Sequence, residues 1–285
     1  MDALPVEGTE FRLIDVPQIE DSGFTHFLDG SQKSKKVLAD GFFPIYISHT
    51  SAAVLARMDR QVQPPQPGLY FDDFSLYVPA GSASLFGGWM KVNPIQATED
   101  DTEMTMKDKV SRAISNKRES QEIQAANAFL QQGGGFLLVD GGIGRILEGN
   151  LQATNLVGVV KTHSKQYFKS QSSVQLMCGM RAGQRTSVFK RESDVSQGAT
   201  VYSFYLKLRE SATESPMFGV IRVEMAPTPE NIERVDEIAA WILHERDPLS
   251  KPDPRHDRML YPIRLVEMQL KARQPSDAAI AALIG

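Results

Sequence analysis

The most informative stretch of this sequence is Gly133-Gly134-Gly135-Phe136-Leu137-Leu138-Val139-Asp140-Gly141-Gly142. Its apolar run, residues 136–139, has the length of a strand and no polar alternation, which predicts a strand buried on both faces. Glycines on either side mark where that strand begins and ends. An Asp at the end of a buried strand is held rigidly and still reaches solvent, and α/β proteins build sites from such positions.

Upstream of the glycines, residues 102–131 form the strongest predicted helix. Thr102 can cap it, the acidic Glu103 favours the first turn, and no Gly or Pro interrupts it before Gly133. Glu122 shares a helix face with Phe129 and other apolar residues, so it should point towards whatever that face covers. Glu119 lies one turn earlier on the same helix.

A second Asp-Gly pair stands near the N-terminus. Residues 24–28 predict a short strand that ends at the turn Asp29-Gly30, followed by a basic turn at 33–36 and a second strand at 42–47. The segment 61–98 is rich in Pro, Gly and aromatic residues and is interpreted as an insertion. Further strands are expected at 156–161, 186–190, 200–209 and 217–225, and helices after Thr228, near Pro262 and after Ser276. The chain is predicted to be one α/β domain, 1–285, with a mixed sheet flanked by helices.

Composition excludes several classes of protein. The chain has 285 residues, is 41% hydrophobic and carries a net charge of −4, as ordinary globular proteins do. No apolar run approaches the ~18 residues that a membrane helix needs, and no secretory signal is visible. The single cysteine, Cys178, cannot form an internal disulfide or a Cys-based zinc site. These features predict a cytoplasmic protein without membrane association.

The chemistry is expected at the two Asp-Gly pairs. Asp29 and Asp140, with Glu122 from the preceding long helix, would form a cluster of carboxylate oxygens, which hard cations such as Mg²⁺ and Mn²⁺ prefer. Two such ions about 4 Å apart activate water and stabilise the leaving oxygen in phosphodiester hydrolysis. The alternative is that both Asp-Gly pairs are plain turns, since the dipeptide is common in turns.

Four short motifs carry a resemblance that extends over roughly residues 24–272. Leu28-Asp29-Gly30-Ser31 resembles the N-terminal Asp-Gly-Ser motif of NurA-type nucleases, and Val139-Asp140-Gly141 after a helix carrying a Glu is similar to their second motif. The apolar strand 156–160 with the following Lys161, and Tyr261-Pro262 at the start of a helix, resemble the next two.

This resemblance implies an RNase H-like fold, with an inserted segment and C-terminal helices, and a manganese- or magnesium-dependent DNA nuclease. It implies that Asp29, Glu122 and Asp140 are metal ligands and that Tyr261 is a site residue. Lys161 would steady the phosphate. Family members often carry a His where this chain has Gln269, and Gln cannot shuttle protons near neutral pH. Glu119 is an alternative to Glu122, and Glu267 a possible substitute ligand.

The resemblance also implies partners. Such nucleases work as dimers with a hexameric HerA-type ATPase that moves DNA, in DNA end processing or in defence against phage. Residues 151–210 hold nine basic and three acidic side chains, with aromatic residues between them, as a DNA-binding surface would. The residues expected to contact DNA are Lys33, Lys35, Lys161, His163, Lys165, Arg181 and Arg185.

Two other functions remain open at this point. A catalytically weak or inactive subunit of the same fold would bind DNA or the ATPase, and Gln269 in place of His favours it. A phosphotransferase would cradle nucleotide phosphate in the glycine-containing loop 140–144, but that loop lacks the following Lys-Ser/Thr pair.

Overall fold

The computed structural model describes residues 3–86, 88, 90–162, 167–194, 197–211, 213–248 and 256–283. The chain divides into two compact units. Unit 1 contains residues 1–28, 55–63 and 130–265, and unit 2 contains residues 29–54, 64–129 and 266–285. Strands β2 (Phe24–Asp40) and β3 (Phe43–Met58) each contribute residues to both units.

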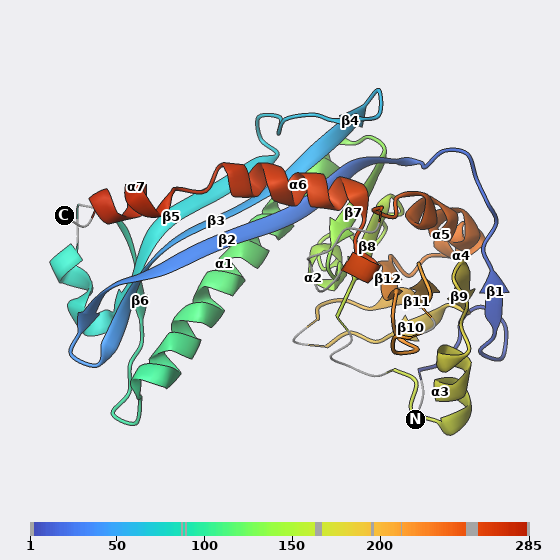
Figure 1. Cartoon of the computed structure of the whole chain (residues 1–285), viewed down its shortest axis with the longest axis horizontal. Coiled ribbons are helices and arrows are strands. Elements are labelled where there is room, and N and C mark those ends of the chain that lie inside the picture. The colour runs from blue at the N-terminus through green and yellow to red at the C-terminus, as the bar shows by residue number, and fades with distance from the viewer. Residues whose placement is uncertain are drawn as a thin grey trace. The chain divides into compact units, whose positions relative to one another are not determined.

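Unit 1 is built on a mixed sheet (Figure 1). Strand β7 (Phe136–Asp140) is parallel to the first part of β2 and to β8 (Leu156–Val160). The remaining neighbours are antiparallel, in the order β8, β12 (Val220–Met225), β11 (Val201–Lys207), β9 (Gln184–Thr186) and β1 (Leu13–Asp15), with β10 (Phe189–Arg191) also on β11. The short β4 (Gln61–Val62) pairs with the end of β3.

Helices cover the sheet of unit 1. Trp241 of α5 (Val235–His244) packs its ring against Phe24 of β2 and Phe136 of β7, with centroid distances of 5.4 and 4.9 Å. A second cluster around Phe168, Phe189 and Tyr205 includes Met177 of α3 (Gln171–Cys178). The other helical segments are α2 (Gly144–Leu147), α4 (Pro229–Glu233) and η2 (His256–Arg258).

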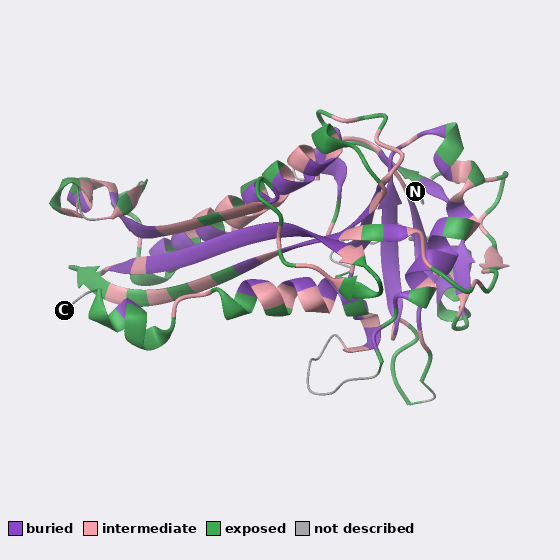
Figure 2. Ribbon diagram, turned by 90° about the horizontal axis from the view of Figure 1, so that it is seen from above, coloured by how far each residue is buried: buried purple, intermediate pink, exposed green. Residues whose placement is uncertain are grey.

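Unit 2 has β2, β3, β5 (Tyr70–Pro79) and β6 (Lys91–Ile95) as successive neighbours. Helix α1 (Glu103–Gln132) packs Val110 and Ile114 against Tyr77 of β5, whereas Ile280 of α7 (Asp277–Ala282) packs against Leu76 and Val78. Since alternate strand residues face opposite sides, α1 and α7 cover opposite faces. Figure 2 shows β3 buried along most of its length. Segment η1 (Ala80–Phe86) and most of α6 (Tyr261–Ala272) complete the unit.

The mixed α/β fold predicted from the sequence is confirmed. The long helix is present as α1, Thr228 and Ser276 cap α4 and α7, and strands form near the expected positions. The segment 61–98 supplies strands β5 and β6 and segment η1 to unit 2. No helix among the described residues is long and apolar enough to cross a membrane.

The prediction that Asp29-Gly30 ends a short strand was wrong. Strand β2 continues through this pair and through the expected basic turn to Asp40, and β3 extends from Phe43 to Met58. Along residues 33–36 the side chains alternate between half-buried and exposed, as they do on a strand with one covered face. Two long neighbouring strands thus replace the expected short ones.

Candidate functional site

Asp140 and Lys161 form an ion pair at the carboxyl ends of two parallel strands. Asp140 is the last residue of β7, and Lys161 directly follows β8. The Lys161 Nζ lies 2.7 Å from Asp140 Oδ1, and Lys161 is buried whereas Asp140 is partly accessible. The backbone of Lys161 is also fixed, because Arg258 donates a hydrogen bond to its carbonyl at 2.7 Å. A buried cation therefore holds an accessible carboxylate in place.

The other Asp-Gly pair, Asp29-Gly30, lies within strand β2, and Glu122 of helix α1 lies beside Gly30. Asp29 is buried, and its Oδ1 accepts a hydrogen bond from the Gly30 N–H at 2.7 Å. A Cβ at position 30 would lie only 2.0 Å from Glu122 Oε1, so the Glu122 carboxylate fills the space that a side chain would need. Arg118 forms an ion pair with Glu122 one helical turn away. As the helix pattern indicated, Glu122 points onto the strand that α1 covers.

The residues that precede the two Asp-Gly dipeptides are partners in the sheet. In unit 1, Leu28 of β2 is the parallel partner of Val139 of β7. The next residue on each strand is an Asp, Asp29 on β2 and Asp140 on β7. Each Asp-Gly dipeptide thus directly follows one member of the Leu28–Val139 pair in the sequence.

Carboxylate oxygens are the donors that Mg²⁺ and Mn²⁺ prefer, so the chemistry of Asp29, Glu122 and Asp140 fits such an ion. Within the described part of the chain, no group of three or more His, Cys, Asp and Glu side chains is placed to hold a metal. The metal ligand set remains a prediction.

The other residues expected at the site lie on α1 and α6. Glu119 is half-buried on α1, and Gln269 is half-buried on α6. Glu267 pairs with Lys271 at 2.7 Å, an ordinary contact along a helix. Tyr261 begins α6, is 48% exposed and donates its N–H to the Glu245 carbonyl at 2.9 Å.

Tyr261 also lines a cavity of about 630 Å³ in unit 1. Basic residues of that cavity are Arg57, Arg60, Arg246 and His244; Glu20, Asp21 and Glu245 lie among them. Arg57 is paired with Glu245 at 2.7 Å. The cavity therefore carries both signs of charge.

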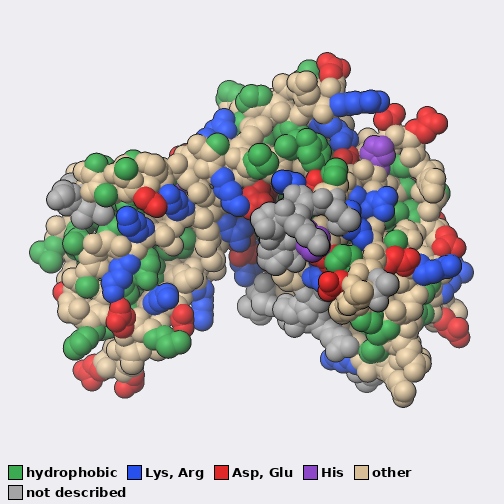
Figure 3. All heavy atoms as spheres, in the orientation of Figure 1, with side chains coloured by type: hydrophobic (Ala, Val, Ile, Leu, Met, Phe, Trp, Pro, Cys, Tyr) green, Lys and Arg blue, Asp and Glu red, His purple; other side chains and the backbone are tan. Residues whose placement is uncertain are grey.

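The residues expected to contact DNA have different surroundings. Lys33 pairs with Asp277 at 2.8 Å, Lys35 is half-buried, and Arg181 is exposed. Lys161 is the buried partner of Asp140 described above, and His163 and Lys165 lie outside the described residues. Figure 3 shows Lys and Arg side chains distributed over the visible face of each unit.

Arg185 does not have the accessible side chain that DNA contact would need. It is 1% exposed, and its guanidinium contacts Glu7 at 2.7 Å and Asp236 at 2.6 Å. Burial opposes its charge, but the hydrogen bonds that the guanidinium donates to these carboxylates outweigh that effect and raise the pKa of Arg185. Although Arg185 lies in a basic stretch of the sequence, it forms ion pairs in the interior of unit 1.

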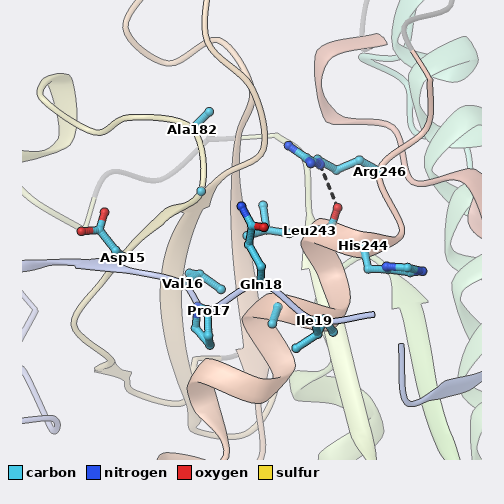
Figure 4. Close-up of a pocket in the computed structure, with 11 residues that line it drawn as sticks. Asp15, Val16, Pro17, Gln18, Ile19, Ala182, Leu243, His244 and Arg246 are labelled. Atoms are coloured by element: carbon cyan, nitrogen blue, oxygen red, sulfur yellow. Dashed lines mark hydrogen bonds between the residues drawn. The ribbon is translucent and has the colours of Figure 1, made fainter. Parts of the chain in front are cut away.

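Two features of unit 1 were missed by sequence reasoning. One is a cavity of about 520 Å³ beside the end of α5, with Asp15, Gln18 and Arg246 at its polar wall (Figure 4). It is formed by segments far apart in the sequence, so no local pattern predicts it. The other is a buried charge cluster around Glu224, for which a signal existed: Arg222 and Glu224 interrupt the otherwise apolar strand 220–225.

Comparison with known proteins relates the chain to a solved structure. No family model matches the chain, and no curated protein matches it. Among solved structures, the chain is similar to the crystal structure of the NurA nuclease from Sulfolobus solfataricus, with a TM-score of 0.51 and 12% identity. The match covers 95% of this chain and 85% of that one. The chain therefore has a NurA-like fold.

Proposed function

We propose that this protein is a metal-dependent DNA nuclease subunit that hydrolyses phosphodiester bonds. The observation that carries the proposal is the pair of Asp residues that follow Leu28 and Val139, which are parallel partners on β2 and β7. The NurA-like fold supports it, because the solved neighbour is named as a nuclease.

In this proposal Asp29, Glu122 and Asp140 provide oxygen ligands for Mn²⁺ or Mg²⁺. When bound, two such ions supply an activated water and stabilise the leaving oxygen of the phosphodiester. The chain's own part is to fix the ligands before substrate arrives. Gly30 admits the Glu122 carboxylate to strand β2, and the Gly30 N–H holds one oxygen of Asp29.

Lys161 has a double role in the proposal. Its ammonium lies 2.7 Å from the Asp140 carboxylate, and it would interact with a phosphate oxygen of the bound substrate. A buried cation is effective here because its charge is less screened by water than that of an exposed one. Tyr261 and Gln269 are proposed to contact the substrate from α6.

DNA binding is proposed for Lys33, Lys35, Arg181, His163 and Lys165. Cationic side chains that neutralise phosphates make binding salt-dependent, so the affinity for DNA should fall steeply between low and moderate salt. Arg185 is omitted from this group because Glu7 and Asp236 already occupy its guanidinium.

The partners implied by the family resemblance are proposals as well. We propose a homodimer that works with a hexameric HerA-type ATPase in DNA end processing or anti-phage defence. Sedimentation of the purified chain at micromolar concentration should give twice the 31.6 kDa of one chain. A mass of one chain at that concentration would contradict the dimer.

The test of the proposed function is cleavage of end-labelled linear DNA by the purified full chain, alone and with its cognate ATPase. We expect cleavage with Mn²⁺ or Mg²⁺, none with EDTA, and none by Asp140→Asn. A second candidate is an inactive DNA- or ATPase-binding subunit, favoured by Gln269 where the family often has His. Metal-independent DNA binding with no cleavage, even beside the ATPase, would support that candidate instead.

A further inference from the structure

Glu224 is a fully buried carboxylate between two arginines in the sheet of unit 1. It is 2% exposed, its Oε1 accepts a hydrogen bond from Arg222 at 2.6 Å, and the same oxygen lies 3.3 Å from Arg191 Nε. Both arginines are themselves buried. Burying a charge is costly unless it is paired and hydrogen-bonded, so the two guanidinium groups compensate the Glu224 carboxylate.

The second oxygen of Glu224 holds the loop that follows Asp140. Its Oε2 accepts a hydrogen bond from the Ile143 N–H at 2.9 Å. Strand register brings it there, because Glu224 pairs with Gly158 of β8, and Gly158 pairs with Val139 of β7. A carboxylate two strands away from β7 therefore reaches the first residues beyond it.

Glycines make room for this contact. A Cβ at Gly142 would lie 3.0 Å from Glu224 Oε2, and a Cβ at Gly158 would lie 2.6 Å from the carbonyl oxygen of Gly141. Gly141 has a φ of 125°, which L side chains rarely adopt. The glycines around Asp140 thus allow its loop to fold down onto the sheet, where Glu224 binds it.

Arg191 ties a second loop to the same point. Its Nη2 donates to the carbonyls of Gln197 at 3.3 Å and Ala199 at 3.0 Å, while the Ala199 N–H donates to the Gly144 carbonyl at 3.0 Å. The loop after Asp140 is therefore held at Ile143 by Glu224 and at Gly144 by the segment that Arg191 binds.

We propose that Glu224 is a positioning residue for Asp140: it clamps residues 141–144 so that the Asp140 carboxylate is presented to metal and substrate in one orientation. This inference rests on the proposed function. Both oxygens of Glu224 are engaged inside the protein, so its proposed role is to position Asp140 and not to bind metal or substrate. The clamp would add a buried positioning residue to the three proposed metal ligands.

Two substitutions at one position separate the parts of the clamp. Glu224→Gln keeps an oxygen that can accept the Ile143 N–H but removes the charge, and Glu224→Leu removes both. A hydrogen bond to a charged group is roughly twice as strong as one between neutral groups. For Glu224→Leu we therefore expect amide hydrogen exchange in residues 141–147 to rise on the order of 10-fold or more. Glu192→Gln, an exposed partner of Lys190 on the same unit, is the matched control.

Cleavage assays on the same variants complete the test. We expect Glu224→Leu to lower kcat on the order of 10-fold or more with KM changed less than about 3-fold, because geometry and not DNA affinity is lost. Glu224→Gln should retain most of the protection and most of kcat, and Glu192→Gln should match wild type. Unchanged exchange in Glu224→Leu overturns the clamp, as does a kcat of Glu224→Gln as low as that of Glu224→Leu with protection intact.

Should Glu224→Leu fail to fold, Glu224→Gln decides alone: Ile143 protection within about 3-fold of wild type supports the clamp, and loss of that protection contradicts it. Exchange is measured without substrate. Absence of cleavage by wild type would therefore refute the proposed function while leaving the result on the clamp readable.

Discussion

The dipeptide Asp-Gly follows two residues that are parallel partners, Leu28 and Val139, and forms two different structures. Asp29-Gly30 lies inside strand β2, which continues for another ten residues to Asp40. Asp140-Gly141 ends strand β7 and turns into a loop, with Gly141 at a φ of 125°. Gly30 is not among the residues with positive φ.

The two glycines therefore serve different needs. Gly141 is required for its backbone conformation, and a Cβ there would meet nothing within 4 Å. Gly30 is required for space, because a Cβ there would meet Glu122 Oε1. One pair ends a strand at a partly accessible Asp, and in the other the missing side chain of Gly leaves room for a helix carboxylate.

The largest effect is expected at the carboxylate that Gly30 admits. Glu122→Gln should lower cleavage on the order of 100-fold or more, because an ion ligand loses its charge while the shape of the side chain is kept. Glu119→Gln, one helical turn away, should stay within a few-fold of wild type. A larger loss of cleavage in Glu119→Gln than in Glu122→Gln would indicate that Glu119 is the ligand. The close approach of Glu122 to Gly30 would then have no role in cleavage.

The same substitution at both glycines should give opposite patterns. Gly141→Ala forces an L side chain into a strained conformation and should lower the free energy of unfolding by about 1–3 kcal/mol. Gly30→Ala should change it by less than about 1 kcal/mol, since the flexible end of Glu122 can move aside. Its cleavage should nevertheless fall about 100-fold, because displacing a reacting group by an ångström is costly.

Urea unfolding and cleavage of each alanine variant check this pair of expectations. Equal losses of stability at both positions would mean that the two glycines play the same role. Full activity of Gly30→Ala would show that the position of Glu122 does not matter for cleavage.

The smallest effect concerns pH and strand β3, the neighbour of β2 in unit 2. Burial lowers the pKa of His49, an effect only partly offset by Asp72 nearby. Because the folded pKa lies below the unfolded value of 6.5, the unfolded chain binds more protons as pH falls. Stability should therefore decrease as pH falls below about 6.5. His49→Gln should show a smaller decrease between pH 7.5 and 5.5 by urea unfolding; an identical decrease would contradict this assignment.

Local patterns were sufficient to predict much of the fold. The uninterrupted helix at α1, the buried run of β7 and the caps at Thr228 and Ser276 depend on nearby residues, and the structure has them. The sequence predicted β2 to end at Asp29-Gly30 because Asp-Gly usually marks a turn. In the structure, position 30 is Gly because the carboxylate of Glu122, 92 residues later, fills the space of a side chain. A local rule cannot detect a contact of that range.

The residues of the candidate site could likewise be predicted from the sequence only in part. Asp29 and Asp140 stand out from the residues around them, and Lys161 follows an apolar strand. Burial of Arg185 between Glu7 and Asp236, and the contact from Glu224 to Ile143, depend on tertiary pairing across 51 to 178 residues. Charge counted along the sequence could not separate buried arginines from accessible ones.

The proposed function depends on both Asp-Gly carboxylates taking part in holding a divalent cation. Its most direct test is binding of Mn²⁺, measured by electron paramagnetic resonance, to wild type, Asp29→Asn and Asp140→Asn, with the exposed Asp72→Asn as control. We expect wild type and Asp72→Asn to bind Mn²⁺ alike and each of the other two variants to bind at least about 10-fold more weakly, since each loses a charged ligand. Equal binding by all four proteins would contradict the claim.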